Sequence, residues 1–122
     1  MSSIGVDSSR VISTQETALI FPMVTPAQIT ANQNNYNPGT GTAFRLKAES
    51  SREITGWVSA VDGKILILTN VGTQNIKLKD NSTSSLEPNR FDLPGDFTIT
   101  PSGGISLIYD TISLRWRAFS IK

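Results

Sequence analysis

The side chains examined first for chemistry are carboxylates and hydroxyls, since the 122 residues of this chain include no histidine and no cysteine. Without histidine, the chain lacks the usual general base near neutral pH and the commonest metal ligand. Without cysteine, it has no thiol nucleophile, no thiolate metal site and no disulfide framework. Serine–histidine–aspartate and cysteine–histidine catalysis within the chain are therefore excluded.

Glu49 and Glu53 come nearest to the paired carboxylates that hydrolyse glycosidic bonds. The turn-like stretch Ser-Ser-Arg at residues 50–52 separates them, and nothing else in the sequence supports hydrolysis. We therefore expect a protein that is not an enzyme, with no catalytic residue and no bound cofactor.

Several aspartates could supply oxygen ligands to a calcium ion. They are Asp62, Asp80, Asp92, Asp96 and Asp110. Most of them lie in expected turns, where aspartate is favoured because its carboxylate binds nearby main-chain amides. Since the D-x-D-x-D-G spacing of a calcium loop does not occur, we expect these residues to shape turns and expect no metal site.

Three side chains are candidates for surface contacts with a partner: Trp57, Asn81 and Arg90. Trp57 ends an expected strand, where an indole either stacks on a ligand or fills the core. Asn81 and Arg90 bound a polar loop that is either a contact site or a solvated loop held by its own side chains. Trp116, by contrast, lies within an expected strand, and we expect it in the core.

The elements that must position these residues are short strands ended by Gly, Asp, Asn or Pro, which is typical of an all-β domain. Apolar residues alternate with polar ones, or form brief apolar runs, at 42–48, 53–58, 64–71, 75–79, 90–93, 96–100, 105–109 and 114–121. The apolar run at 64–71 predicts a central strand buried on both sides. Asp62-Gly63 predicts a tight hairpin turn. About eight strands without a helix beyond one turn favour an antiparallel β-sandwich, jelly-roll-like, over residues 42–122.

Residues 1–41 differ from the rest and predict an extended N-terminal arm. Pro22 and Pro26 make a regular helix or a central strand unfavourable there, so we expect one edge strand at residues 17–21. The arm is either a disordered tail, a segment folded back on its own domain, or an arm docked on a neighbouring chain. We favour docking, because exposed apolar side chains are unfavourable. The expected anchors are Leu19, Phe21, Val24 and Tyr36.

The charge of the chain is close to balanced, with 11 basic and 10 acidic residues and a formal net charge of +1. That balance gives no electrostatic drive toward nucleic acid or an anionic membrane. No charged-then-apolar leader and no membrane-spanning apolar run occur in the sequence. We expect a soluble protein made in a cytoplasm, stabilised by packing or by association with other chains.

The chain resembles a β-domain widespread in phage virion proteins, including capsid cement or decoration proteins and tail-fibre-associated domains. The residues that carry the resemblance are PAQITANQNNYNP at 26–38, REITG at 52–56, DGKILILTNVG at 62–72, NSTSSLEPNRF at 81–91 and SLIYDTISLRW at 106–116. The resemblance spans most of the chain, from about residue 22 onward. Its motifs are structural, and none is catalytic.

The resemblance implies a structural protein of the virion, at the particle surface and made in the bacterial cytoplasm. A β-domain with an arm fits a capsid cement protein best, with the major capsid protein and other copies of itself as partners. We expect a homo-oligomer, with a trimer favoured and a dimer next. The alternative is a short tail-fibre or receptor-binding head that recognises host glycans, and a third class is a free carbohydrate-binding domain.

Overall fold

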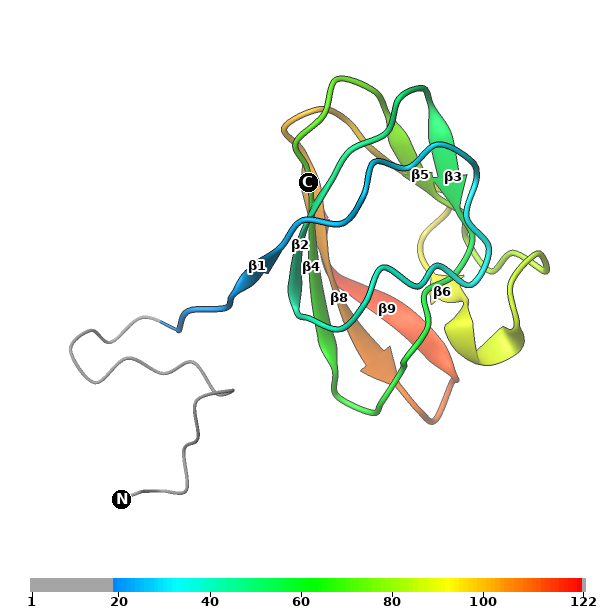
Figure 1. Cartoon of the computed structure of the whole chain (residues 1–122). Helices are drawn as coiled ribbons and strands as arrows, with labels where there is room; N and C mark the ends of the chain where they lie inside the picture. Colours follow the sequence, from blue (N-terminus) through cyan, green and yellow to red (C-terminus); the bar gives the residue numbers. More distant parts are fainter. Residues whose placement is uncertain (1–18, 122) are drawn as a thin grey trace, which may run out of the picture.

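Nine strands and one turn of 3-10 helix form the part of the chain that the computed structural model describes, residues 19–121 (Figure 1). The strands are β1 (Met23–Val24), β2 (Ala43–Leu46), β3 (Arg52–Ile54), β4 (Ile65–Asn70), β5 (Ile76–Leu78), β6 (Phe91–Asp92), β7 (Phe97–Ile99), β8 (Gly104–Asp110) and β9 (Arg115–Ile121). The helical turn, η1 (Glu87–Asn89), is too short to alter the all-β class predicted from the sequence.

The strands form two sheets, one of six strands in the order β1-β2-β4-β8-β9-β6 and one of three in the order β3-β5-β7. The expectation of antiparallel pairing throughout is wrong, because β1–β2, β2–β4, β3–β5 and β6–β9 are parallel pairs. The pairs β4–β8, β5–β7 and β8–β9 are antiparallel. Only β8 and β9 form the tight antiparallel pair that the sequence predicted.

The turn predicted at Asp62-Gly63 is present, but it does not join a hairpin. Gly63 has a φ of 83°, and the Lys64 N–H bonds to the Val61 carbonyl over 2.9 Å. The strand before the turn, β3, lies in the three-stranded sheet, whereas β4 after it lies between β2 and β8. The chain thus crosses from one sheet to the other at this turn, and long-range pairing overrides the local hairpin signal.

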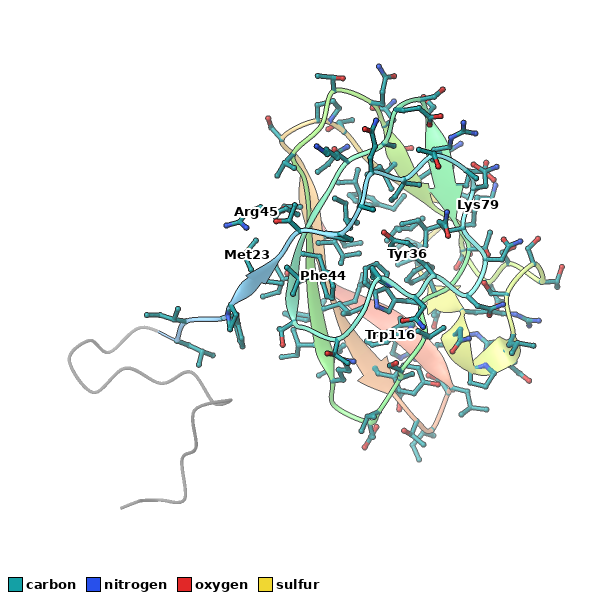
Figure 2. The ribbon with its side chains drawn as sticks, in the orientation of Figure 1. Met23, Tyr36, Phe44, Arg45, Lys79 and Trp116 are labelled. Carbon is teal, nitrogen blue, oxygen red and sulfur yellow. The ribbon has the colours of Figure 1, made fainter. Side chains whose placement is uncertain are left out.

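Large apolar side chains of both sheets form one core, in which two tryptophans are central. The rings of Tyr36 and Phe44 contact Trp57 edge to face, with ring centres 5.0 and 5.1 Å away. Tyr109 meets Trp116 in the same way at 5.0 Å. Figure 2 shows Tyr36, Phe44 and Trp116 turned toward the interior. The prediction that Trp116 belongs to the core is confirmed, because its side chain is fully buried.

The prediction that residues 64–71 form a strand buried on both sides is only half right. The run forms β4, which is central in its sheet, and its inward residues Leu66 and Leu68 are fully buried. Its outward residues Ile65 and Ile67 are half-buried, because no second layer of the described chain covers them. The outer face of this sheet is therefore apolar at its centre.

The arm predicted at residues 1–41 is too long, because residues 29–36 belong to the β-domain. Ile29 and Tyr36 are only 3% and 7% exposed. The main-chain N–H groups of Ile29, Gln33 and Tyr36 bond to carbonyls of residues 47–56 over 2.8–2.9 Å. This stretch follows β2 and β3 in parallel through single bridges, so it lacks the alternating pattern of a regular strand. The boundary lies near residue 25.

The edge strand was expected at residues 17–21, and the structure places it slightly later, at β1. Residues 17 and 18 lie outside the described part of the chain, so the structure does not test the beginning of that expectation. The segment that contains β1 projects from the edge of the six-stranded sheet, away from the core (blue in Figure 1).

Candidate functional site

The N-terminal segment, defined here as residues 19–24, is the most apolar projecting surface that the structure describes. Leu19 is 63% exposed, Ile20 is 41% exposed and Met23 is 40% exposed. Phe21 and Val24 are half-buried. Pro22 removes one main-chain donor, which is tolerated because the segment lies at a sheet edge. An apolar segment that leaves its own domain is typical of a site that binds another chain.

Three contacts fix the direction in which this segment leaves the domain. Met23 and Val24 pair in parallel with Ala43 and Phe44 of β2. Val24 packs against the core, directly over Gly41, where a Cβ would lie only 2.6 Å from the Val24 Cγ2 atom. The Arg45 guanidinium then donates a hydrogen bond of 3.1 Å to the Thr25 hydroxyl. These three contacts hold the C-terminal end of the segment on the domain and so determine where the segment leaves it.

The four expected anchors fall into three groups. Leu19 is exposed and open to a partner, and Phe21 and Val24 are half-buried. Tyr36 is a correction: it is buried within its own domain, where its ring packs on Trp57 and its carbonyl accepts the Val58 N–H over 3.0 Å. Burial raises the pKa of the Tyr36 phenol. Tyr36 therefore holds residues 29–36 on the domain instead of anchoring a second chain.

Trp57 is a second correction, because the structure buries this candidate surface aromatic to 1% exposure. Its ring lies between those of Tyr36 and Phe44. Its carbonyl accepts a hydrogen bond of 2.9 Å from the Trp116 indole N–H. The indole of Trp57 is a core side chain and offers no stacking surface for a sugar.

Asn81 and Arg90 are placed in the same loop, but they do not form one site. Asn81 has a φ of 49°, and its side-chain oxygen accepts a bond of 3.0 Å from the Arg115 Nε atom. Arg90 is half-buried and donates from Nε to the Ser85 carbonyl over 2.9 Å. Asn81 holds the loop to β9, and Arg90 holds the loop to itself, which supports the structural interpretation of this polar cluster over a contact site.

A polar junction that the sequence did not reveal ties residues 29–36 to the loop before η1. The Asn35 main-chain N–H donates to the Ser85 hydroxyl over 2.8 Å, and the Asn35 side-chain oxygen accepts from the Leu86 N–H over 2.8 Å. The Thr55 and Ser85 hydroxyls lie 2.7 Å apart. Asn35 has a φ of 50°, a conformation that asparagine tolerates better than most residues. An asparagine at position 35 was therefore the one sequence feature that could have indicated this junction.

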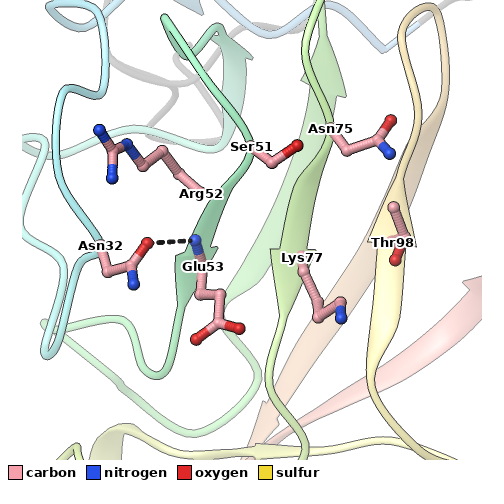
Figure 3. Close-up of a pocket in the computed structure, with 7 residues that line it drawn as sticks. All are labelled: Asn32, Ser51, Arg52, Glu53, Asn75, Lys77 and Thr98. Carbon is pink, nitrogen blue, oxygen red and sulfur yellow. Dashed lines mark hydrogen bonds between the residues drawn. The ribbon is translucent and has the colours of Figure 1, made fainter.

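A polar hollow of about 340 Å³ lies on the outer face of the three-stranded sheet (Figure 3). Glu53, Lys77 and Thr98 stand directly opposite one another across β3, β5 and β7. Asn32 closes one side, where its side-chain oxygen accepts the Glu53 main-chain N–H over 3.0 Å. All of its lining residues have polar side chains, which can form hydrogen bonds with a ligand.

Of the two carboxylates considered for hydrolysis, Glu53 lies on the outer face of the three-stranded sheet and Glu49 is paired with an arginine. Arg52 donates two bonds to Glu49 of 2.8 and 2.9 Å, and these bonds lower the pKa of Glu49. The pKa values of Asp96 and Asp110 are also lowered, first by hydrogen bonds from Lys79 and Ser113 respectively. A general acid needs a raised carboxyl pKa, so none of these three carboxyls suits that role.

Within residues 19–121, no group of three Asp, Glu, His or Cys side chains is arranged to hold a metal ion. The same described region contains no helix with the length and apolar character needed to cross a membrane. Comparison of the chain with protein-family models, with curated proteins and with solved structures found no match.

Proposed function

We propose that this chain is a structural protein of a bacteriophage virion, a capsid cement protein that binds and stabilises the lattice of the major capsid protein. The resemblance of its motifs to phage virion β-domains supports this function. The main structural observation in favour of this function is that the N-terminal segment exposes the apolar side chains of Leu19, Ile20 and Met23 beside a well-packed domain. In this proposal the two sheets form a jelly-roll-like sandwich that sits on the capsid surface.

The N-terminal segment would bind by lying along the capsid protein as an added strand or a clamp. Extended segments of this kind gain affinity from main-chain hydrogen bonds, and their alternate side chains fill pockets. Leu19 and Ile20 are the strongest anchors because they are the most exposed apolar residues of the segment that have no role in the domain's own core. Each apolar side chain covered by a partner contributes roughly 25 cal/mol per Å² buried.

A second candidate function is a short tail-fibre or receptor-binding head that recognises host glycans. The polar hollow favours it, because Asn32, Glu53 and Lys77 could bind sugar hydroxyls there. Binding of a host surface polysaccharide that is lost in Lys77→Ala and kept in Leu19→Asp would favour this function over the capsid function.

The experiment that tests the capsid function is reconstitution of the protein on particles that lack it. We expect the full chain to bind and to raise the temperature at which the particles disrupt. The double variant Leu19→Asp/Ile20→Asp should fold normally and fail to bind, since a charge at each anchor opposes burial. Thr98→Asp, on the face opposite the projecting segment, is the matched control. Binding of the double variant with unchanged affinity would contradict the role of the segment.

A further inference from the structure

The polar hollow on the three-stranded sheet contains a cation without a counter-ion. Lys77 lies on β5, the middle strand of that sheet, and its side chain is half-buried on the outer face. Among the described residues, no carboxylate lies within 4.0 Å of its ammonium group. The neighbouring Lys79, by contrast, lies 2.8 Å from Asp96. Polar side chains alone are typical of a solvated sheet face, so the unpaired ammonium in a recess is what distinguishes this face.

The hollow is bounded on one side because residues 29–36 run along the edge strand β3. Gln33 is bridged to Ile54 at the end of β3, and the Asn32 side-chain oxygen accepts the Glu53 main-chain N–H over 3.0 Å. Figure 3 shows Asn32 on one side of β3, with Lys77 and then Thr98 on the other side. The volume of the hollow, about 340 Å³, lies within the range of sites for small ligands.

One half of the hollow, over β5 and β7, offers donors to an anionic group. Thr98 is opposite Lys77 in register, and Asn75 precedes Lys77 by two residues on the same side. Arg52, the other cation of the lining, is already engaged: its Nε and Nη2 atoms donate to Glu49 over 2.8 and 2.9 Å. Figure 3 shows Arg52 turned away from Lys77. An ammonium, an amide and a hydroxyl therefore lie together, and charge-assisted bonds from such groups to an anionic oxygen are strong.

The other half of the hollow, over β3, offers an acceptor beside a donor. The Glu53 carboxylate can only accept hydrogen bonds, and the Lys79 ammonium 4.0 Å away offsets part of its charge. The Asn32 side-chain oxygen is used by the Glu53 main chain, so the free group of Asn32 is its amide NH₂, which can only donate. A carboxylate beside an amide NH₂ can bind adjacent hydroxyl groups of one ligand.

We propose that the hollow binds an acidic saccharide. The sugar carboxylate lies over Lys77, Asn75 and Thr98, and the ring hydroxyls lie over Glu53 and Asn32. Because neighbouring strands are about 4.8 Å apart, the two halves of the hollow are separated by about one strand spacing. In a uronic acid, a single pyranose ring separates the carboxylate from the hydroxyls of the opposite ring edge, which matches that arrangement. A neutral sugar fills the hydroxyl half and leaves the Lys77 ammonium without an anionic partner.

This ligand class rests on the second candidate function, saccharide recognition, and specifies the saccharide. It is separate from the capsid function, because the hollow lies on the three-stranded sheet and the N-terminal segment leaves from the six-stranded sheet. Binding of a sugar in solution therefore neither requires nor excludes attachment to a particle. The contribution of Lys77 is electrostatic and partly open to solvent, so salt should weaken it.

The test is titration of the full chain with methyl glucuronide, followed residue by residue in proton–nitrogen NMR spectra. We expect main-chain amide shifts in β3, β5 and β7 and at residues 32–33, with a Kd on the order of 1 mM. Methyl glucoside, which has a hydroxymethyl group in place of the carboxylate, should bind at least about tenfold more weakly, because it forms no charge-assisted bond with Lys77. Sodium acetate controls for the charge alone and should cause much smaller shifts.

Substitution of Lys77 tests which group selects the acid. Lys77→Gln should raise the Kd for methyl glucuronide by about tenfold and leave the Kd for methyl glucoside unchanged. Lys77→Arg keeps the positive charge and should keep most of the preference. Lys47→Gln is the matched control, because Lys47 is exposed directly after β2 of the other sheet and its loss changes the net charge by the same amount. This control should bind methyl glucuronide as the wild type does.

Equal affinity for the two methyl glycosides would overturn the acidic ligand and leave saccharide recognition standing. Equal shifts with acetate would show a simple anion site, and equal behaviour of Lys77→Gln and Lys47→Gln would rule out Lys77 as the selecting group. An absence of shifts in the three-stranded sheet with both glycosides would overturn the proposal and remove the support that the hollow gives to saccharide recognition. The capsid function is tested separately on particles and is unaffected by any of these results.

Discussion

The indole N–H of Trp116 donates a hydrogen bond of 2.9 Å to the main-chain carbonyl of Trp57, 59 residues earlier in the chain. Both side chains are fully buried. The bond joins β9 of the six-stranded sheet to the stretch after β3, and it satisfies a carbonyl that has no access to water. A core bond of this kind stabilises the packing of the two sheets against each other as well as the fold of each sheet.

Trp116→Phe should therefore lower the free energy of unfolding by about 2 kcal/mol or more. The change leaves the Trp57 carbonyl without its donor and removes part of a ring that packs against Tyr109. Tyr109→Phe is the matched control: it deletes the hydroxyl that donates to the Pro88 carbonyl over 2.7 Å, at a partly buried position. That change should cost only about 1 kcal/mol. Urea unfolding followed by tryptophan fluorescence measures both, and equal losses would contradict the weight given to the indole bond.

Two N-terminal deletions should behave differently, because the domain begins near residue 25. Removing residues 1–22 keeps β1 and the whole core, so the circular dichroism spectrum and the unfolding midpoint should stay near those of the full chain. Removing residues 1–38 also deletes Ile29 and Tyr36, which are buried. Losing two core side chains costs about 5 kcal/mol or more, close to the whole stability of a small domain. A folded, stable 39–122 fragment would show that residues 29–36 are dispensable.

Asn35→Ala should destabilise the domain more than Asn35→Gly. Both changes remove the side-chain oxygen that accepts bonds from Leu86 and Asn89 over 2.8 and 2.9 Å. Alanine also has to adopt a φ near 50°, which adds about 1 kcal/mol of strain that glycine does not bear. Asn37→Ala, at an exposed neighbouring position, is the control and should be nearly neutral. The order of the unfolding midpoints checks the prediction; a glycine variant less stable than the alanine variant would rule out the strain term.

The ion pair of Asp96 and Lys79, 2.8 Å apart, should make a small pH-dependent contribution to stability. The Lys79 hydrogen bond lowers the pKa of Asp96 below its ordinary value of 3.8. A lowered carboxyl pKa contributes stability above the unfolded value, and that contribution disappears as the pH falls through the folded value. Asp96→Asn should therefore lose stability relative to the wild type at neutral pH and converge with it in acid, once the pH has fallen below the lowered pKa of Asp96. The urea midpoint, measured from neutral to acid pH, reports the difference, and parallel curves would contradict it.

The sequence was sufficient to place most strands, because alternation marks each of them locally. It also identified Trp116 as a core residue and Leu19 as an exposed apolar residue of the N-terminal region. It could not supply the pairing of β3 with β5 or of β2 with β4, since parallel partners are separated by a crossing to the other sheet and leave no turn signal between them.

The burial of Tyr36 and Trp57 could not be predicted from the sequence, for a related reason. Residues 29–36 join the domain through isolated bridges, so their side chains show no regular period. The polar junction at Asn35 depends on Ser85, a residue 50 positions away. Contacts of this range are fixed by the tertiary fold and leave no local pattern in the sequence.

The position of β9 between β8 and β6 has a consequence for the order in which the protein is made. β6 has no other strand partner in the described chain, so it can join its sheet only after β9 has been synthesised. A nascent chain that has emerged only as far as β8 leaves Phe91 and the Trp57 carbonyl without the partners that Trp116 provides. The domain therefore cannot close its core piece by piece on the ribosome. Strand β9 completes the packing of the earlier strands, so the domain finishes folding only after β9 has been synthesised.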